Sequence, residues 1–102
     1  MSQFVVVYKG GAKAETPEAQ QASMDAWMGW FGSLGSAVSQ MGAPFGASAA
    51  EASDASLSDA TTGLTGYTVI EANDLAEVAN HVASCPIHRE GGTVEVFEAL
   101  AM

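Results

Sequence analysis

Basic residues are scarce in this chain of 102 residues, which has three lysines and arginines against twelve aspartates and glutamates. The net charge of −9 leaves no counter-charge for phosphate groups, so nucleic-acid binding and anionic-membrane binding are excluded on that ground. Charged residues of either sign make up only 15% of the chain, against roughly 25% in typical soluble domains. A surface this poor in charge indicates that part of it is covered in the working assembly.

Cysteine and long apolar runs are also nearly absent. Cys85 is the single cysteine, so no disulfide can form within the chain, and a cytoplasmic location is expected. The longest apolar run is Phe4–Tyr8, far short of the roughly 20 residues that cross a membrane, and no signal peptide is visible. Beside Cys85 and His88 there is no second pair of metal ligands and no phosphate-binding glycine loop, so neither a metal nor a cofactor is predicted.

Three segments have the composition of β-strands. Gln3–Tyr8 is apolar on both of its alternating faces, and a strand of this kind is normally covered on both sides. Gly66–Ala72 and Thr93–Leu100 are the other two, the last with Val94 and Val96 on one face and Phe97 on the other. Ser36–Met41 is a weaker candidate for a fourth strand.

Two helices are indicated by their capping residues. Thr16-Pro17-Glu18 begins the first, which is expected to run to about Leu34 before Gly35 ends it. Asp74, with Glu77 three residues later, begins the second, which ends at Cys85-Pro86. The expected buried stripes are Met24, Trp27, Trp30, Phe31 and Leu34 on the first helix, and Leu75, Val78, Ala79 and Val82 on the second.

Two features leave alternatives open. Gly29 and Gly32 lie on the polar side of the first helix, where each costs about 1 kcal/mol relative to alanine. Either packing holds the helix in spite of this cost, or another group approaches the helix backbone closely there. The segment 47–65, rich in alanine and serine, is either a plain surface loop, with at most a weak strand or turn, or a lid over a pocket.

The order strand–helix–strand occurs twice, on either side of this loose middle. Two such halves form the ferredoxin-like split βαβ pattern, an α+β fold in which two helices cover one face of an antiparallel sheet. Because Phe4–Tyr8 is apolar on both faces, the face without helices is expected to pack against a second copy of the chain. The sequence therefore predicts one domain over residues 1–102 and a homodimer joined through sheet faces.

Several short segments, taken in order, resemble the YCII-related family and in particular its short acidic single-domain members. They are FVVVYKGG at 4–11, WMGWFGSLG at 27–35, PFG at 44–46, GLTGY at 63–67, CP at 85–86 and GGTVEVFEAL at 91–100. The resemblance implies a dimeric α/β barrel of ferredoxin-like subunits. Some members are proposed to use a His–Asp pair in a cleft beside the sheet. In this chain the first helix has no histidine, and Trp27 and Trp30 occupy its centre. The DGPF motif of a related branch is also absent.

The candidate site residues follow from their chemistry. His88 is the titratable group best suited to move protons near neutral pH, with Asp59 or Asp54 as an orienting carboxylate; as plain alternatives, all three are solvated loop residues. Cys85 is expected to be buried and inert, because free cysteine is usually buried and this acidic chain offers little to stabilise a thiolate. An apolar pocket is predicted to have aromatic walls and a few polar groups, drawn from Trp27, Trp30, Phe31, Pro44, Phe45, Tyr67 and His88.

Among the helix aromatics, Trp27 and Phe31 fit a core position, whereas Trp30 lies at the stripe edge and is the better pocket residue. Two functions remain open at this point. The first is a cytoplasmic dimer that binds a small metabolite near Trp30, Phe45 and His88, with His88 as an acid or base if a reaction is catalysed. The second is a non-catalytic structural or regulatory dimer whose acidic face binds a protein partner.

Overall fold

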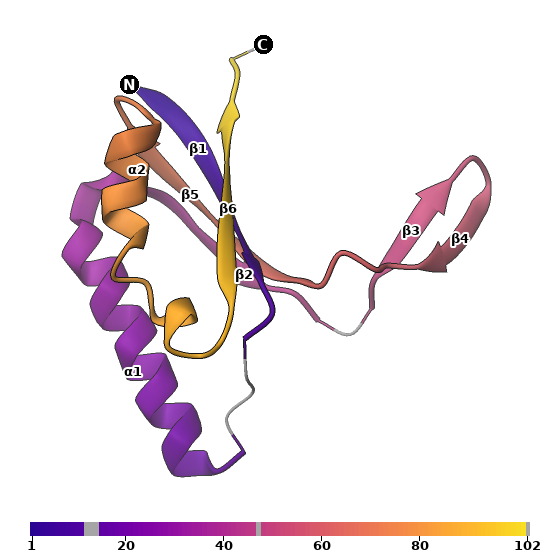
Figure 1. Cartoon of the computed structure of the whole chain (residues 1–102), viewed down its shortest axis with the longest axis horizontal. Helices are drawn as coiled ribbons and strands as arrows, with labels where there is room; N and C mark the ends of the chain where they lie inside the picture. The colour runs from indigo at the N-terminus through magenta and orange to yellow at the C-terminus, as the bar shows by residue number, and fades with distance from the viewer. Residues whose placement is uncertain (12–14, 47, 102) are drawn as a thin grey trace.

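The apolar segment near the N-terminus forms strand β1 (Ser2–Lys9), a central strand of a four-stranded sheet in the computed structural model (Figure 1). The structure describes residues 1–11, 15–46 and 48–101. The strand order is β2–β5–β1–β6, in which β2 is Val38–Pro44, β5 is Leu64–Ala72 and β6 is Thr93–Ala99. Every neighbouring pair in this sheet is antiparallel.

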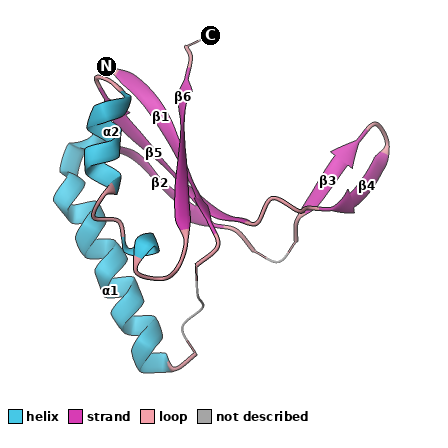
Figure 2. Ribbon diagram, in the orientation of Figure 1, coloured by secondary structure: helices cyan, strands magenta, loops and turns pink. Residues whose placement is uncertain are grey.

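The helices α1 (Pro17–Leu34) and α2 (Leu75–Val82) both cover the same face of the sheet (Figure 2). Short 3₁₀ turns, η1 (Gly35–Ala37) and η2 (Pro86–His88), follow the two helices. The predicted ferredoxin-like α+β architecture, an antiparallel sheet with two helices on one face, is therefore confirmed.

The predicted capping residues begin both helices. Thr16 Oγ1 accepts a hydrogen bond from the Ala19 backbone N–H at 3.1 Å, and Asp74 Oδ1 accepts one from the Glu77 N–H at 2.9 Å. Each bond satisfies a backbone donor that has no partner within the helix. Gly35 ends α1 with φ 58°, a left-handed conformation that costs glycine little.

The core lies between the helices and the sheet. Phe4, Val6 and Tyr8 of β1 point toward the helices and are buried, while Val5 and Val7 between them point to the other face and are half-buried. The remaining buried side chains of the core cluster come from α1, β5, α2 and the segment after it: Trp30, Ile70, Ala72, Val78, Val82, Cys85 and Ile87. Because each buried aliphatic side chain contributes about 1.5–3 kcal/mol, this layer is the main source of stability.

Three expectations about local structure need correction. The second strand begins at Val38 and not at Ser36, because Gly35–Ala37 continues as a 3₁₀ turn. On α2, Leu75 and Ala79 are exposed, since only Val78 and Val82 of this short helix point at the sheet. Met24 of α1 is also exposed, because the sheet does not contact this half of the helix closely and a cavity lies beside it.

The middle segment, whose first residue 47 lies outside the described residues, is not a lid over this sheet and holds more than the weak strand or turn that the sequence allowed. It contains a separate two-stranded hairpin, β3 (Ala50–Ser53) and β4 (Ser56–Asp59), that projects away from the rest of the molecule (Figure 1). All of its side chains are exposed, including Leu57. Asp54 takes a positive φ of 56° in the connecting turn, a conformation that aspartate tolerates better than most residues.

Candidate functional site

A cavity of about 610 Å³ lies between α1 and the sheet, where β1 and β2 end and β5 begins. Its size is within the range of roughly 300–1,000 Å³ that is typical of small-molecule sites. The two halves of the chain both contribute to it, because the antiparallel pairing of β1 with β5 sets Tyr8 opposite Gly66. Gly66 has no side chain, which leaves the Tyr8 ring room at this end of the sheet.

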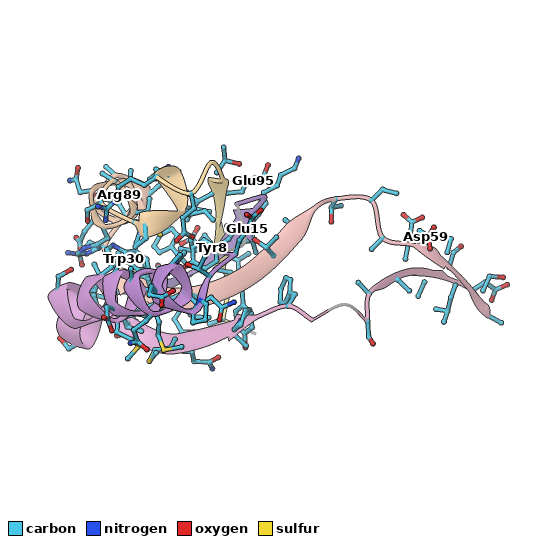
Figure 3. All side chains as sticks on the ribbon, turned by 90° about the horizontal axis from the view of Figure 1, so that it is seen from below. Tyr8, Glu15, Trp30, Asp59, Arg89 and Glu95 are labelled. Atoms are coloured by element: carbon cyan, nitrogen blue, oxygen red, sulfur yellow. The ribbon has the colours of Figure 1, made fainter. Side chains whose placement is uncertain are left out.

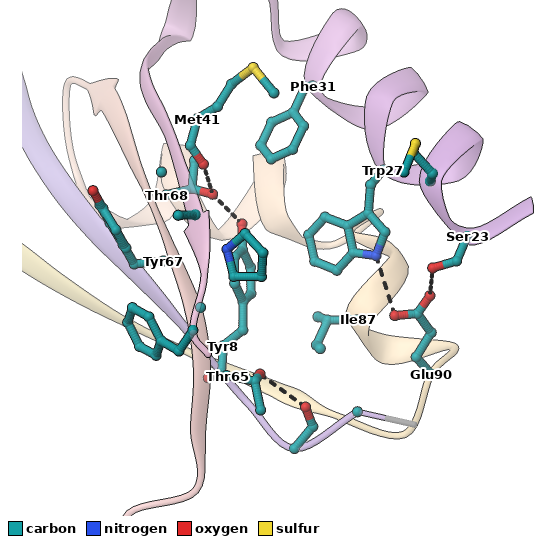
Figure 4. A pocket seen from close by; sticks show the side chains of 18 of the residues that line it. Tyr8, Ser23, Trp27, Phe31, Met41, Thr65, Tyr67, Thr68, Ile87 and Glu90 are labelled. Atoms are coloured by element: carbon teal, nitrogen blue, oxygen red, sulfur yellow. Dashed lines mark hydrogen bonds between the residues drawn. The ribbon is translucent and has the colours of Figure 1, made fainter. Parts of the chain in front are cut away.

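The cavity walls are largely apolar (Figure 4). They are formed by Met24, Trp27 and Phe31 of α1, Met41 and Pro44 of β2, Phe45 just after it, and Ile87 of η2. Trp27 meets the Tyr8 ring edge-on, with the ring centroids 5.0 Å apart. These edge-to-face contacts fix the orientation of both rings, so the wall is formed before any ligand arrives.

One group of polar contacts joins the phenol of Tyr8 to strand β2. Tyr8 Oη lies 2.6 Å from Thr68 Oγ1, and Thr68 Oγ1 donates a hydrogen bond to the Met41 carbonyl at 2.9 Å. Burial raises the pKa of Tyr8 far above its ordinary value, an effect that the bond to Thr68 only partly offsets. The phenol therefore stays neutral and acts as a hydrogen-bonding group.

A second polar group lies on the opposite side of the cavity. The half-buried carboxylate of Glu90 accepts a hydrogen bond from Ser23 Oγ at 2.6 Å and another from Trp27 Nε1 at 3.3 Å. Ser23 and Trp27 lie four residues apart and hence on one face of α1. The two bonds hold Glu90, which follows η2, against this helix, and Glu90 lines the cavity there (Figure 4).

The structure divides the residues that the sequence singled out. Trp27, Phe45 and Tyr67 line the cavity, and Phe45 stacks on Tyr67 with centroids 6.0 Å apart. Trp30 does not line it; its side chain is buried in the core, and its Nε1 donates a hydrogen bond to the His81 carbonyl at 3.0 Å. The roles expected for the two tryptophans are thus exchanged, because α1 is rotated so that Trp30 faces α2.

His88 and Asp59 are also placed outside the cavity. His88 Nε2 lies 3.0 Å from the Val82 carbonyl at the end of α2, where a ring N–H satisfies one of the last acceptors of that helix. Asp59 lies at the end of β4 in the projecting hairpin, far from Trp30 and from Arg89, which follows His88 in the chain and lies in the body of the molecule (Figure 3). The geometry therefore does not join these two residues into an acid–base pair.

Cys85 is buried in the core, as expected. Burial raises the pKa of its thiol to about 11, and the negative charge of Glu90 acts in the same direction. In the described part of the chain, no group of three or more histidine, cysteine or carboxylate side chains is arranged to hold a metal ion. Among the same residues, neither helix combines the length and the hydropathy needed to cross a membrane.

Tyr8, Ser23 and Glu90 were not singled out as site residues by the sequence. Tyr8 reads as one more apolar residue of a strand, and no spacing rule links Ser23 to Glu90 across 67 positions. The one available signal was the position of Tyr8 at the end of a strand, next to Lys9-Gly10-Gly11.

The fold, but not the sequence, has a counterpart among known proteins. No family model matches the chain, and no curated protein is significantly similar to it in sequence. Among solved structures, it is similar to 5-chloro-2-hydroxyhydroquinone dehydrochlorinase (TftG) from Burkholderia phenoliruptrix AC1100, in complex with 2,5-dihydroxybenzoquinone. The TM-score is 0.62 at 14% identity, over 98% of this chain and 95% of that one. This similarity defines the fold as the ferredoxin-like α+β type of dimeric α/β barrel proteins.

Proposed function

We propose that this protein binds a small, planar and largely apolar molecule in the cavity between α1 and the sheet. The observation that carries the proposal is the cavity itself, with preformed aromatic walls and a few placed polar groups. Such a combination is typical of small-molecule sites. The groups that a bound molecule would touch are the rings of Trp27 and Phe31 and the oxygens of Tyr8 and Glu90.

The structural neighbour supports the same class of ligand. That protein was solved in complex with 2,5-dihydroxybenzoquinone, a planar ring that carries hydroxyl groups. We extend to this chain only the class, a ring compound of this kind. Together with the segments quoted above, the shared fold also supports membership of the YCII-related family, which we propose for the chain as well.

A second part of the proposal is that the chain works as a homodimer joined through the face of the sheet without helices. Val5 of β1 lies opposite Val69 of β5 on one side and Phe97 of β6 on the other, which forms an apolar row across three strands. Phe97 is 54% exposed. A second copy of this charge-poor chain is the natural cover for such a row, since it would present the same row in return.

The binding proposal is tested by calorimetry with a panel of substituted benzenes and naphthalenes. We expect at least one member to bind, and Phe31→Ala to weaken it by about tenfold or more, because a cavity wall is lost. His88→Ala serves as the matched control and should leave the affinity unchanged, since His88 lies outside the cavity. Absence of binding across the panel would favour the other function, a structural or regulatory dimer. Each ligand that binds is then incubated with the protein and followed by chromatography to detect turnover.

A further inference from the structure

The direction of the hydrogen bonds between Tyr8 and Thr68 follows from one group that can only accept, the Met41 carbonyl. The Met41 carbonyl can only accept, so Thr68 gives its single proton to it at 2.9 Å. Thr68 Oγ1 must then accept a hydrogen bond from the Tyr8 hydroxyl at 2.6 Å, so the phenol proton is already bonded within the protein. Thr65 Oγ1 likewise donates to the backbone, with the Gly10 carbonyl at 3.0 Å. Of the Tyr8 hydroxyl, only lone pairs remain for a molecule in the cavity.

The hydrogen-bond donors beside Glu90 are also already bonded within the protein. Ser23 Oγ and Trp27 Nε1 each donate their one proton to the carboxylate, one to each of its oxygens. Each carboxylate oxygen can accept further hydrogen bonds, and Ser23 Oγ keeps lone pairs of its own. At these two places the Tyr8 hydroxyl and the Glu90 carboxylate therefore present acceptors to the cavity.

In the part of the chain that the structure describes, the charge of Glu90 has no basic side chain paired with it, since no lysine, arginine or histidine there forms an ion pair with its carboxylate. The net charge of −9 adds to the negative potential around it. A partly buried carboxylate in this setting gains most from a strong donor, because hydrogen bonds to charged groups are stronger than neutral ones.

We infer that the ligand of this cavity is a ring compound that donates hydrogen bonds, through a hydroxyl or an ammonium group, to Glu90 and Tyr8. The inference rests on the proposed function and specifies its ligand class. The inference predicts that ligands of the same shape bind differently according to whether they donate hydrogen bonds. Ethers, esters and simple carbonyl compounds only accept, so they leave Glu90 and Tyr8 without partners and should bind more weakly. Carboxylate ligands are disfavoured further, since their charge meets that of Glu90.

The test compares naphthalenes of matched shape by calorimetry at pH 7. The probes are 2-naphthol, 2-methoxynaphthalene, 2-naphthylmethylammonium and 2-naphthoate. We expect the naphthol and the ammonium compound each to bind at least about tenfold more tightly than the methoxy compound, and the naphthoate not to bind. The order of the first two shows whether the site prefers a hydroxyl or a cation.

Glu90→Gln is the informative variant, because it preserves the shape of the side chain but turns an amide donor toward the cavity. It should bring the affinities for 2-naphthol and 2-methoxynaphthalene to within about threefold of each other. Asp25→Asn, which removes one negative charge from an exposed position of α1, is the control and should leave the preference intact.

The outcomes separate the two proposals. Equal binding of 2-naphthol and 2-methoxynaphthalene to the unmodified protein overturns the inference but leaves the binding function standing. The same holds if the preference survives in Glu90→Gln. If none of the four probes binds, the inference fails. Binding of any member of the panel of substituted benzenes and naphthalenes would still support the proposed binding function.

Discussion

Trp27 and Trp30 show how three positions along a helix separate two roles. Both are apolar, and both lie on the stripe that faces the rest of the molecule. Trp30 points at α2 and is 5% exposed, so it belongs to the core. Trp27 is half-buried beside Tyr8, where its indole edge is bonded to Glu90. The rotation of α1 about its own axis decides which indole meets the cavity.

Because of Cys85, the stability of the folded chain is expected to fall at alkaline pH. The thiol pKa is about 11 in the folded chain against an ordinary value of 9.0, so the unfolded chain loses this proton first as the pH rises. The stability that the protonated Cys85 thiol gives to the folded chain is therefore fully present below about pH 9 and is lost as the pH rises to about 11. We expect the free energy of unfolding to fall across this window, by an amount on the order of 2 kcal/mol.

Urea denaturation at several pH values measures this dependence. Cys85→Ala is the control; it is less stable throughout, because a buried atom is lost, but its stability should fall less steeply between pH 9 and 11. Parallel curves for the two proteins would show that the thiol does not titrate differently on folding.

Two glycines of neighbouring elements should respond to alanine in opposite directions. A Cβ at Gly42, where φ is 74°, would overlap the carbonyl oxygen of Tyr67 in β5. We expect Gly42→Ala to destabilise the fold by about 3 kcal/mol, since backbone must move on both strands. A Cβ at Gly29 in α1 would meet no described atom within 4 Å apart from its chain neighbours and the backbone of its own helix. Gly29→Ala should therefore stabilise the helix by about 0.5–1 kcal/mol.

Chemical denaturation of the two variants tests this pair of predictions. Stabilisation by Gly29→Ala would also show that the helix keeps this glycine at a cost, with no group packed on its backbone. A loss of stability there would mean instead that a second chain approaches the helix at this position.

The β3–β4 hairpin is expected to be dispensable for folding. Among the described residues its two strands pair only with each other, and none of its side chains is buried. An isolated two-stranded hairpin is marginally stable in water. Because Ala50 and Asp59 are paired partners, Asn-Gly can replace residues 50–59. The unfolding free energy should then change by less than about 1 kcal/mol. A larger loss, measured by urea denaturation, would show that the hairpin packs on another part of the assembly.

The apolar row on the open face predicts the size of the particle in solution. Light scattering at micromolar concentration should give about twice the chain mass of 10.4 kDa. Phe97→Glu places a charge in the row opposite Val5 and should reduce the particle to the mass of one chain, because burying an unpaired carboxylate is costly. Met28→Glu, at an exposed position of α1, is the control and should leave the mass unchanged. A single-chain mass for the unmodified protein would refute the sheet-face dimer.

The elements of the fold follow from local features of the sequence. Strand β1 is a run of β-branched and aromatic residues, and both helices begin at side-chain caps that lie within three residues of the groups they satisfy. The order of these elements restricts the topology to very few arrangements. Fold class, the order of the two helices and the four strands of the main sheet, and the burial of Cys85 were therefore determined by the sequence itself, whereas the β3–β4 hairpin was not.

The polar part of the cavity was decided only by the tertiary structure. Its two polar groups join Tyr8 to Thr68 across 60 positions and Ser23 to Glu90 across 67. Such contacts depend on strand register and on the rotation of α1, which are fixed by packing over the whole molecule. The same packing placed Trp30 in the core and His88 at the end of α2. Periodicity predicts most of the residues that face inward, although Met24, Leu75 and Ala79 are exposed. Which of the inward residues contact one another depends on how the helices pack on the sheet.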